Sequence, residues 1–269
     1  MKIVFLGTGA TTPSQTRYTP SIAVCAARDC MLLDCGEGVQ IRLQEAGIDV
    51  LRISYVVITH IHGDHIYGLM PLIDSFTMKV LSQRIREKKL HIYAPRGLCN
   101  SNNQHFTEII KCHEISPQIN NGFIEIGEFK FKPLPMLHGN IDALGIYITS
   151  ESNAKRKADL FYSGDGLCSE ECMKFLKKAK PCIIIHDASF LDYHDDVIKA
   201  REKFHATVAD AAKLALEVDA KILILTHISN RYRNDDLRDF LSRASRIFQG
   251  DIFIASDLST LWLDKLWCV

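Results

Sequence analysis

Short apolar runs recur along nearly the whole chain and alternate with segments of helical periodicity. Such runs, bounded by turn-forming residues, are typical of β-strands. Because strands and helices are interleaved, with no repeat and no low-complexity linker, the pattern predicts an α/β fold of two sheets flanked by helices. The expected strands are 2–6, 21–25, 31–35, 55–58, 90–93, 123–126, 130–134, 144–148, 160–162, 182–185, 222–225, 252–254 and 260–263.

Helical periodicity is clearest over 64–81, where apolar residues recur at spacings of three and four and therefore share one face. The segment 207–217 begins with Thr207 and Asp210, a capping box in which Asp takes the place of Glu. Further helices are expected at 38–46, 169–178 and 235–247. We expect residues 1–269 to form a single domain of two similar layers.

Composition limits the class of protein. Hydrophobic residues make up 47% of the 269 residues, which is enough for a sizeable core and excludes a wholly disordered chain. Lys and Arg number 32 and Asp and Glu number 32, so a globally basic histone-like binder is excluded while a local basic patch is not. No apolar run reaches the roughly 18 residues that a membrane helix needs, and the apolar start of the chain is too short for a signal peptide. We therefore expect a cytoplasmic protein that does not enter a membrane.

The nine cysteines form no Cys-x-x-Cys motif, which argues against a thiolate zinc module. Several lie in apolar runs, where free cysteine behaves as a small buried hydrophobe. We expect all of them to be reduced, as is usual in the cytosol.

The segment 55–65 places three histidines and one aspartate directly after a buried strand. His60 and His62 are two residues apart, so both can point the same way from an extended chain. Asp64 and His65 follow across a turn. Imidazole and carboxylate are ligands of zinc, and isolated His and Asp are rarely buried unpaired. The segment therefore predicts a metal site.

Three later residues offer the further ligands that a site for two ions needs. His138, Asp165 and His227 each lie just beyond the end of an expected strand, where sites form in α/β sheets. Each of them alone is a weak sign, because a histidine at a strand end is more often structural. Together with the segment 55–65 they predict a pair of metal ions, an arrangement that can hold both oxygens of a phosphodiester displacement.

Longer motifs around these residues resemble the metallo-β-lactamase superfamily, and within it the ribonuclease Z family of tRNA 3′-end endonucleases. The resemblance covers nearly the whole chain. The His-x-His-x-Asp-His pattern is specific only to the superfamily, whereas its continuation and the motif around His227 are more discriminating. The motifs are Phe5-Leu-Gly-Thr-Gly-Ala10, Leu33-Asp-Cys-Gly-Glu37, Thr59-His-Ile-His-Gly-Asp-His-Ile-Tyr-Gly-Leu69, Ser163-Gly-Asp165 and Leu225-Thr-His-Ile-Ser-Asn-Arg-Tyr232.

The resemblance implies an αββα sandwich and two zinc ions per subunit, although such ligands also accept manganese or iron. It implies that His60, His62 and His138 hold one ion, that Asp64, His65 and His227 hold the other, and that Asp165 bridges them.

The resemblance also implies catalytic roles. A metal-bound hydroxide, oriented by Asp64, attacks phosphorus. His205 then protonates the leaving ribose oxygen. Its carboxylate partner is Asp187, which stands where the family has the glutamate of a His-Glu-Ala-Thr loop.

The chain departs from the family in one segment. Ribonuclease Z proteins usually carry a long arm that grips tRNA, whereas residues 149–159 are expected to make only a short turn. Cations elsewhere are candidate phosphate contacts that would compensate, although solvated surface is an equal explanation. The candidate substrate-binding residues are Lys79, Arg84, Arg86, Lys88, Lys89, Ser229 and Arg231, with a second basic cluster at Lys155, Arg156 and Lys157.

The favoured function is a zinc-dependent endoribonuclease that cleaves the 3′ trailer of precursor tRNA and leaves a 3′-hydroxyl on the tRNA. The alternative is a phosphodiesterase with two metal ions that acts on small or cyclic nucleotides or short RNA. A metal-binding RNA-binding protein without turnover, and a thioester or lactam hydrolase, are less favoured. The family tends to be dimeric, so a homodimer that binds precursor tRNA or other RNA is expected.

Overall fold

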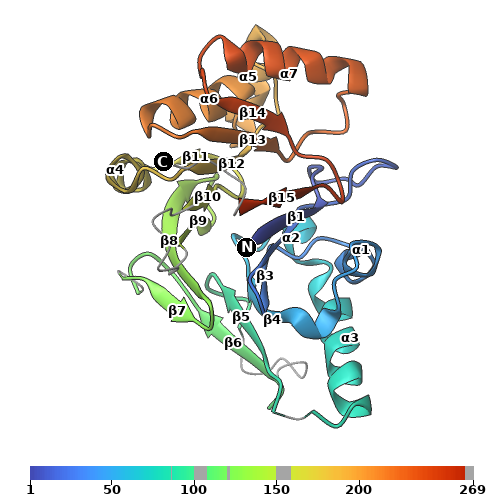
Figure 1. The fold of residues 1–269 in the computed structure, drawn as a ribbon. Coiled ribbons are helices and arrows are strands. Elements are labelled where there is room, and N and C mark those ends of the chain that lie inside the picture. The colour runs from blue at the N-terminus through green and yellow to red at the C-terminus, as the bar shows by residue number, and fades with distance from the viewer. Residues whose placement is uncertain (86, 100–107, 120–121, 150–158, 264–269) are drawn as a thin grey trace. The chain divides into compact units, whose positions relative to one another are not determined.

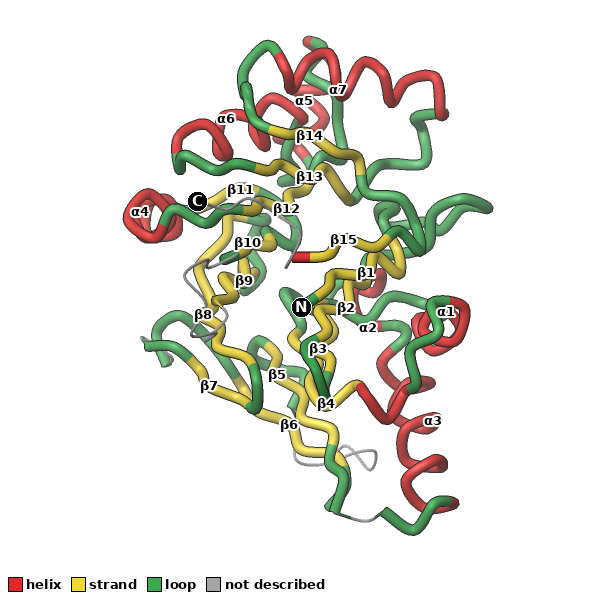
Figure 2. The backbone as a smooth tube through the Cα atoms, viewed as in Figure 1, coloured by secondary structure: helices red, strands yellow, loops and turns green. Residues whose placement is uncertain are grey.

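The computed structural model describes residues 1–85, 87–99, 108–119, 122–149 and 159–263. The chain divides into two compact units, of which unit 1 holds Met1–Ile115 with the segment from Ser256, and unit 2 holds Ser116–Ala255. Each unit has one β-sheet and its own helices, and we describe each by itself (Figures 1 and 2). The single domain stays a prediction. Of the turn expected at 149–159, residues 150–158 lie outside the described residues, as do Lys155, Arg156 and Lys157.

The sheet of unit 1 joins the two ends of the chain. Its order is β15-β1-β2-β3-β4-β5-β6, and Lys2 of β1 lies opposite Trp262 of β15. The loop after β1 is fixed by Asp257, which accepts hydrogen bonds from the amide and hydroxyl of Thr8 at 3.0 and 2.7 Å. The strands are β1 Lys2–Gly7, β2 Ser21–Cys25, β3 Cys30–Leu33, β4 Ile53–Val57, β5 Leu90–Ala94, β6 Ile110–Glu114 and β15 Thr260–Trp262.

Helices α1 and α3 lie on one side of this sheet (Figure 1). Leu72 and Phe76 of α3 are fully buried and share a core with Val56 and Ile92 of the sheet. The apolar face expected over 64–81 is therefore the face that packs on the sheet. The helices of unit 1 are α1 Val39–Glu45, η1 Val50–Arg52, α2 Gly63–Ile66 and α3 Leu69–Ser82.

The prediction of one continuous helix over 64–81 is wrong at Tyr67 and Gly68, where α2 ends before α3 begins. The amide of Gly68 donates to the carbonyl of Cys35 at 2.9 Å, so it leaves the helical hydrogen-bond pattern. A Cβ at Gly68 would lie 2.0 Å from the carbonyl oxygen of Gly36, so only glycine permits this approach. The break anchors the metal-site segment to the loop after β3.

The sheet of unit 2 has the order β11-β8-β9-β10-β12-β13-β14, with β7 beside β8. Strands β10, β12, β13 and β14 are parallel neighbours. Their carboxyl ends therefore meet at one edge of the sheet, as the sequence predicted for residues that follow them. The strands are β7 Ile124–Ile126, β8 Phe129–Leu137, β9 Ala143–Thr149, β10 Leu160–Tyr162, β11 Leu167–Cys168, β12 Ile183–Asp187, β13 Ile222–Thr226 and β14 Asp251–Ile254.

Helices α6 and α7 lie side by side along β13 and β14 in unit 2 (Figure 1). The predicted capping box at the start of α6 is confirmed, since the Thr207 side chain accepts from the Asp210 amide and Asp210 accepts in return from Thr207. The helices of unit 2 are α4 Glu170–Ala179, α5 His194–Glu202, α6 Val208–Glu217, η2 Asn234–Asp236 and α7 Leu237–Ser245. Among the described residues, no helix is long and apolar enough to cross a membrane.

The prediction that every cysteine is reduced is wrong. Cys25 and Cys30 form a disulfide, as do Cys99 and Cys112. Cys25 and Cys30 are cross-strand neighbours at the end of the β2–β3 hairpin, so the fold itself brings them together. Sequence spacing of five residues did not reveal this pairing, because it depends on the strand register.

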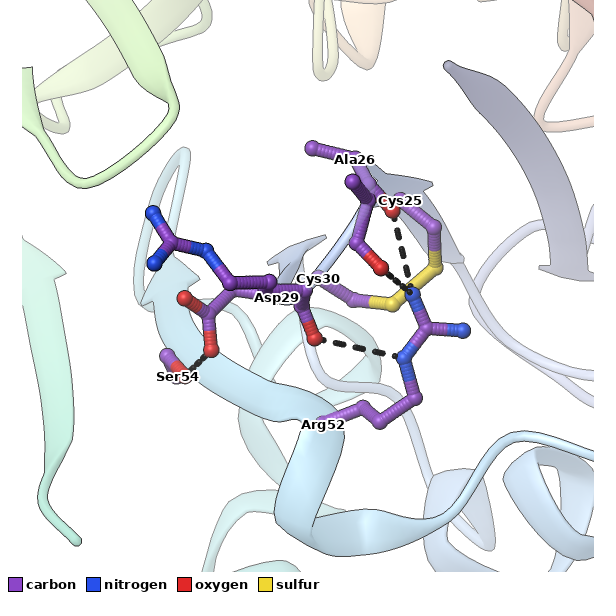
Figure 3. Close-up of a disulfide and its surroundings, with 8 residues drawn as sticks. Cys25, Ala26, Asp29, Cys30, Arg52 and Ser54 are labelled. Carbon is purple, nitrogen blue, oxygen red and sulfur yellow. Dashed lines mark hydrogen bonds between the residues drawn. A yellow bond between two sulfur atoms is a disulfide. The ribbon is translucent and has the colours of Figure 1, made fainter.

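Figure 3 shows the hydrogen bonds that fix the β2–β3 hairpin around the Cys25–Cys30 disulfide. The guanidinium of Arg52 donates to the carbonyls of Ala26 at 3.0 Å and Ala27 at 3.3 Å. The Ser54 hydroxyl donates to the Asp29 carboxylate in the same turn. The turn is therefore fixed by polar contacts as well as by the disulfide.

Opening the second disulfide is expected to destabilise the chain. The double variant Cys99→Ser with Cys112→Ser should lower the free energy of unfolding by about 3 kcal/mol, because a loop of this length loses its cross-link in the unfolded state. Urea unfolding of the variant and of the wild type, both without reductant, measures the difference. Equal stability, together with reactive thiols at both positions in the folded wild type, would contradict the bond.

Candidate metal centre

The loop after β4 and the short helix α2 that follows it carry three imidazoles and one carboxylate. The Nε2 atom of His60 lies 3.1 Å from the Nδ1 atom of His62, and the Nε2 atom of His65 lies 3.6 Å from Oδ2 of Asp64. His60 and His65 are fully buried and Asp64 is nearly so. We call these four residues the unit 1 cluster.

Asp34 orients the unit 1 cluster. Its carboxylate accepts from Nδ1 of His65 at 2.8 Å and from the amide of Thr59 at 2.8 Å, and it is fully buried. The Thr59 hydroxyl in turn contacts Nδ1 of His60 at 3.0 Å. These contacts hold the Nδ1 side of both rings, so the Nε2 atoms of His60 and His65 are directed toward the cluster. Asp34 has a left-handed φ of 57°, a conformation that costs energy and is concentrated at functional sites.

Replacing Asp34 is expected to weaken metal binding without touching a ligand. Partners of ligating histidines typically contribute about 10- to 100-fold in metal affinity, so Asp34→Ala should lose affinity in that range. Competition with a zinc chelator measures it. Asp29→Ala, which removes a carboxylate from the surface turn of Figure 3, is the control and should bind as the wild type does. Equal affinity in the two variants would show that Asp34 does not orient the ligand.

In unit 2, two histidines converge on Asp165. The Nε2 atom of His138 lies 3.8 Å from Oδ2 of Asp165, and the Nε2 atom of His227 lies 3.2 Å from Oδ1. All three side chains are buried. The Nδ1 atom of His138 donates to the carbonyl of Phe204 at 2.6 Å, and the Nδ1 atom of His227 lies 2.7 Å from the Ser189 hydroxyl. Both rings are thereby fixed with Nε2 toward the carboxylate.

His205 is held beside this group by Asp187. Its Nδ1 atom lies 3.0 Å from Oδ2 of Asp187, and its ring stacks with that of His227 at a centroid distance of 5.2 Å. Asp187 is one methylene shorter than glutamate, and it reaches His205 from the end of β12. Its Oδ2 atom also accepts hydrogen bonds from the amides of Gly166 and Ala206.

The charge state of Asp187 follows from its surroundings. Burial would raise the pKa of its carboxyl, but the imidazoles of His205 and His227 and the hydrogen bond to His205 outweigh burial and leave that pKa below its usual range. Asp187 is therefore an anion that can hold a protonated His205.

The residues of each unit fit divalent metal ions by their chemistry. Ligand atoms of Asp165, Asp187, His205 and His227 all lie within 4.8 Å of one another. In both units, imidazole Nε2 atoms and carboxylate oxygens are directed to one place by bonds made on their far sides. This is the usual support of a metal ligand, and nitrogen and oxygen donors of this kind suit zinc, manganese and iron.

The structure places the predicted phosphate contacts mostly in pairs with other groups. Lys79 lies 2.6 Å from Asp49, and Lys88 lies 2.9 Å from Asp29. Lys89 donates to the Glu108 carbonyl at 2.7 Å, and Arg84 follows α3. An RNA phosphate would therefore compete with carboxylates at Lys79 and Lys88. Arg86 lies outside the described residues.

Ser229 and Arg231 follow His227 in unit 2. The guanidinium of Arg231 donates to the Ser229 hydroxyl at 3.1 Å and lies 4.4 Å from the centroid of the Phe190 ring. Phosphate contact by these two residues stays a prediction.

Sequence reasoning missed the residues that orient the ligands, namely Asp34, Thr59, Ser189 and the backbone of Phe204. Asp34 lies in the motif Leu33-Asp-Cys-Gly-Glu37, and Ser189 ends the segment His186-Asp-Ala-Ser189. Both residues therefore stand in segments that the sequence already marked as functional. The Phe204 carbonyl contacts His138 through the backbone. Every residue has such a carbonyl, so the sequence could not reveal this contact.

Known proteins resemble this chain along nearly its whole length. The family model of the anti-Pycsar protein Apyc1 matches residues 1–248. A ribonuclease Z of Saccharolobus islandicus is 32% identical, with 98% of this chain and 99% of the relative covered, and a ribonuclease Z of Methanocaldococcus jannaschii is 30% identical with 98% of each covered. The chain belongs to the family that the Apyc1 model describes, and its relatives make it a member of the ribonuclease Z family.

Solved structures agree with this membership. The short form of human tRNase Z has a TM-score of 0.77 and 26% identity over 98% of this chain and 99% of that one. The metallo-β-lactamase-fold protein YhfI of Bacillus subtilis has a TM-score of 0.79 and 20% identity over 97% and 98%. The predicted fold class, a metallo-β-lactamase-like α/β fold, is confirmed.

The enzyme class is confirmed as well. As a member of the ribonuclease Z family, the chain is a hydrolase of phosphodiesters, of the ribonuclease Z type. Its His and Asp clusters suit the divalent metal ions that this family uses.

Proposed function

We propose that the chain is a zinc-dependent endoribonuclease that removes the 3′ trailer of precursor tRNA and leaves a 3′-hydroxyl on the tRNA. The observation that carries the proposal is the pair of His205 and Asp187, joined at 3.0 Å beside Asp165. A buried carboxylate that holds Nδ1 of an imidazole makes Nε2 of the same ring a proton donor. Relatives named ribonuclease Z and human tRNase Z support the choice of substrate.

The proposed ligands are those that the family resemblance implies. His60, His62 and His138 would hold one zinc ion, Asp64, His65 and His227 would hold the second, and Asp165 would bridge the two. When bound, such ions lower the pKa of water and stabilise negative charge on a phosphodiester. Asp64 would orient the attacking water and accept its proton, and His205 would donate a proton to the leaving ribose 3′-oxygen.

Binding of the RNA would depend on cations that this chain already has. The alignment with the ribonuclease Z of Saccharolobus islandicus spans 303 positions, more than the 269 residues of this chain, so that relative carries segments that this chain lacks. This supports an enzyme without a long arm that binds tRNA through Lys79, Arg84, Arg86, Lys88, Lys89, Ser229 and Arg231. A cytoplasmic homodimer, in which one subunit binds the RNA that the other cleaves, would compensate for the arm.

Cleavage of a 3′-extended precursor tRNA tests the proposal. The zinc-loaded protein should cut once, next to the discriminator base, and both product ends should be mapped. A chelator should abolish the cut, and so should His65→Ala. If the protein hydrolyses bis(p-nitrophenyl) phosphate but does not cut the precursor tRNA, the proposed substrate is wrong and only phosphodiester hydrolysis is supported.

The second candidate is a phosphodiesterase that acts on small or cyclic nucleotides or short RNA. The specific observation in its favour is the same shortness of the chain relative to the ribonuclease Z proteins. Competition separates the two functions. Excess tRNA at low salt should inhibit hydrolysis of a small phosphodiester by a tRNA endonuclease, whereas a cyclic nucleotide should inhibit it in the second case.

A further inference from the structure

Phe204 is an exposed aromatic residue just after the end of α5. Its side chain is 54% exposed, so its ring contributes only part of the stability that burial would give. Its backbone has a φ of 57°, in the left-handed region where a bulky residue is an outlier. Glycine would take the same conformation with less strain. The left-handed conformation belongs to the end of α5, where the amide of His205 donates to the carbonyl of Ala200 at 2.8 Å. The exposed ring, rather than the backbone, is therefore the feature that a ligand could use.

The position of Phe204 shows which function to consider. Its carbonyl oxygen accepts from Nδ1 of His138 at 2.6 Å, and the next residue is His205. Its ring lies over Gly139, since a Cβ at Gly139 would be 3.2 Å from the ring carbon Cδ2. The exposed ring thus belongs to the loop of unit 2 that carries His205 and lies against the loop that carries His138.

A nucleobase of the substrate is a suitable stacking partner for the exposed ring of Phe204. A phosphodiester held at His205 has a nucleoside on each side, so a base lies within one nucleotide of the imidazole. Bases have apolar faces that stack on exposed aromatic side chains, and stacking tolerates any base sequence.

We propose that the ring of Phe204 is the platform on which a nucleobase next to the scissile phosphate stacks, and that it thereby positions the RNA for His205. This inference rests on the proposed function. The ring contributes binding to a substrate that has a base at this position and none to a phosphodiester without bases. Phe204 is accordingly a substrate-positioning residue, and its backbone carbonyl separately orients His138.

The test compares two substrates in the zinc-loaded full chain. The substrates are 3′-extended precursor tRNA and bis(p-nitrophenyl) phosphate, which has no base. The measured quantity is the ratio of kcat/KM on RNA to kcat/KM on the small diester, so any effect on the metal ligands cancels. Phe204→Leu should lower this ratio about tenfold, the scale of one base stack, and Phe204→Tyr should keep it. Phe253→Leu, which removes another exposed ring of unit 2, is the matched control and should keep the ratio.

A second measurement identifies the base. Abasic substitution of the nucleotide on either side of the cut should cost the wild type about tenfold at one of the two positions. Phe204→Leu should lose nothing further on that substrate, because the two changes remove the same contact. Additive losses would overturn the stack.

The failures are distinguishable. If the wild type hydrolyses the small diester and does not cut RNA, the proposed function is wrong and the inference falls with it. If the wild type cuts RNA and Phe204→Leu lowers both activities equally, the ring acts only through His138 and the platform is refuted. An unchanged ratio in Phe204→Leu refutes it as well.

Discussion

Asp165→Ala should lose both bound zinc ions and keep its fold. Asp165 would be the one ligand shared by the two ions, and the Nε2 atoms of His138 and His227 already converge on its oxygens. Without the carboxylate, no negative charge would separate the two neighbouring cations. Loss of the ions would remove both the activation of the attacking water and the stabilisation of the leaving oxygen. Turnover on either phosphodiester should therefore fall by about a thousandfold or more.

Metal analysis and circular dichroism measure the two halves of this prediction. Zinc per chain should drop from two to near zero, while the thermal transition of the metal-free protein changes little. Asp235→Ala, which removes an exposed aspartate of unit 2, should keep both ions. Two zinc ions retained by Asp165→Ala would end the assignment of Asp165 as a bridge.

His205→Ala should lower turnover on RNA by about 10²- to 10⁴-fold, the usual contribution of general acid catalysis, at unchanged zinc content. The side chain contacts Asp187 and the His227 ring but is not a proposed ligand. Cleavage rates at saturating RNA, with zinc measured on the same samples, check the expectation. His194→Ala, on exposed α5, is the control. Unchanged turnover in His205→Ala would remove this residue from the reaction.

Most strands were predictable because their apolar runs are short and well separated. β10 was predicted with the bounds that the structure gives, and most of the others within two residues. β6 was missed because Ile-Lys-Cys-His-Glu lacks an apolar run, and α5 was missed because it buries only Ala200 and carries mostly charged side chains. Pairing with β5 decides the structure of β6, whereas α5 has no apolar face from which a sequence pattern could reveal it.

The ligand residues were predictable because their types and their places after strands are both visible in a sequence. The residues that orient the ligand histidines were harder to predict. Asp34 contacts His65 across 31 positions, and Ser189 contacts His227 across 38, so neither pair shares a local pattern. The Cys25–Cys30 disulfide was missed for a different reason, because these two residues are close in sequence and meet only through the register of two strands.

The pairing of β15 with β1 has a consequence for how the chain is made. β1 is synthesised long before β15, its partner on one side, because Lys2 lies opposite Trp262. During synthesis β1 therefore carries an open edge, which is where nascent chains join one another and aggregate. Contacts so distant in sequence also slow folding, because a long loop must close first. Expression at low temperature or with chaperones should therefore raise the yield of folded protein.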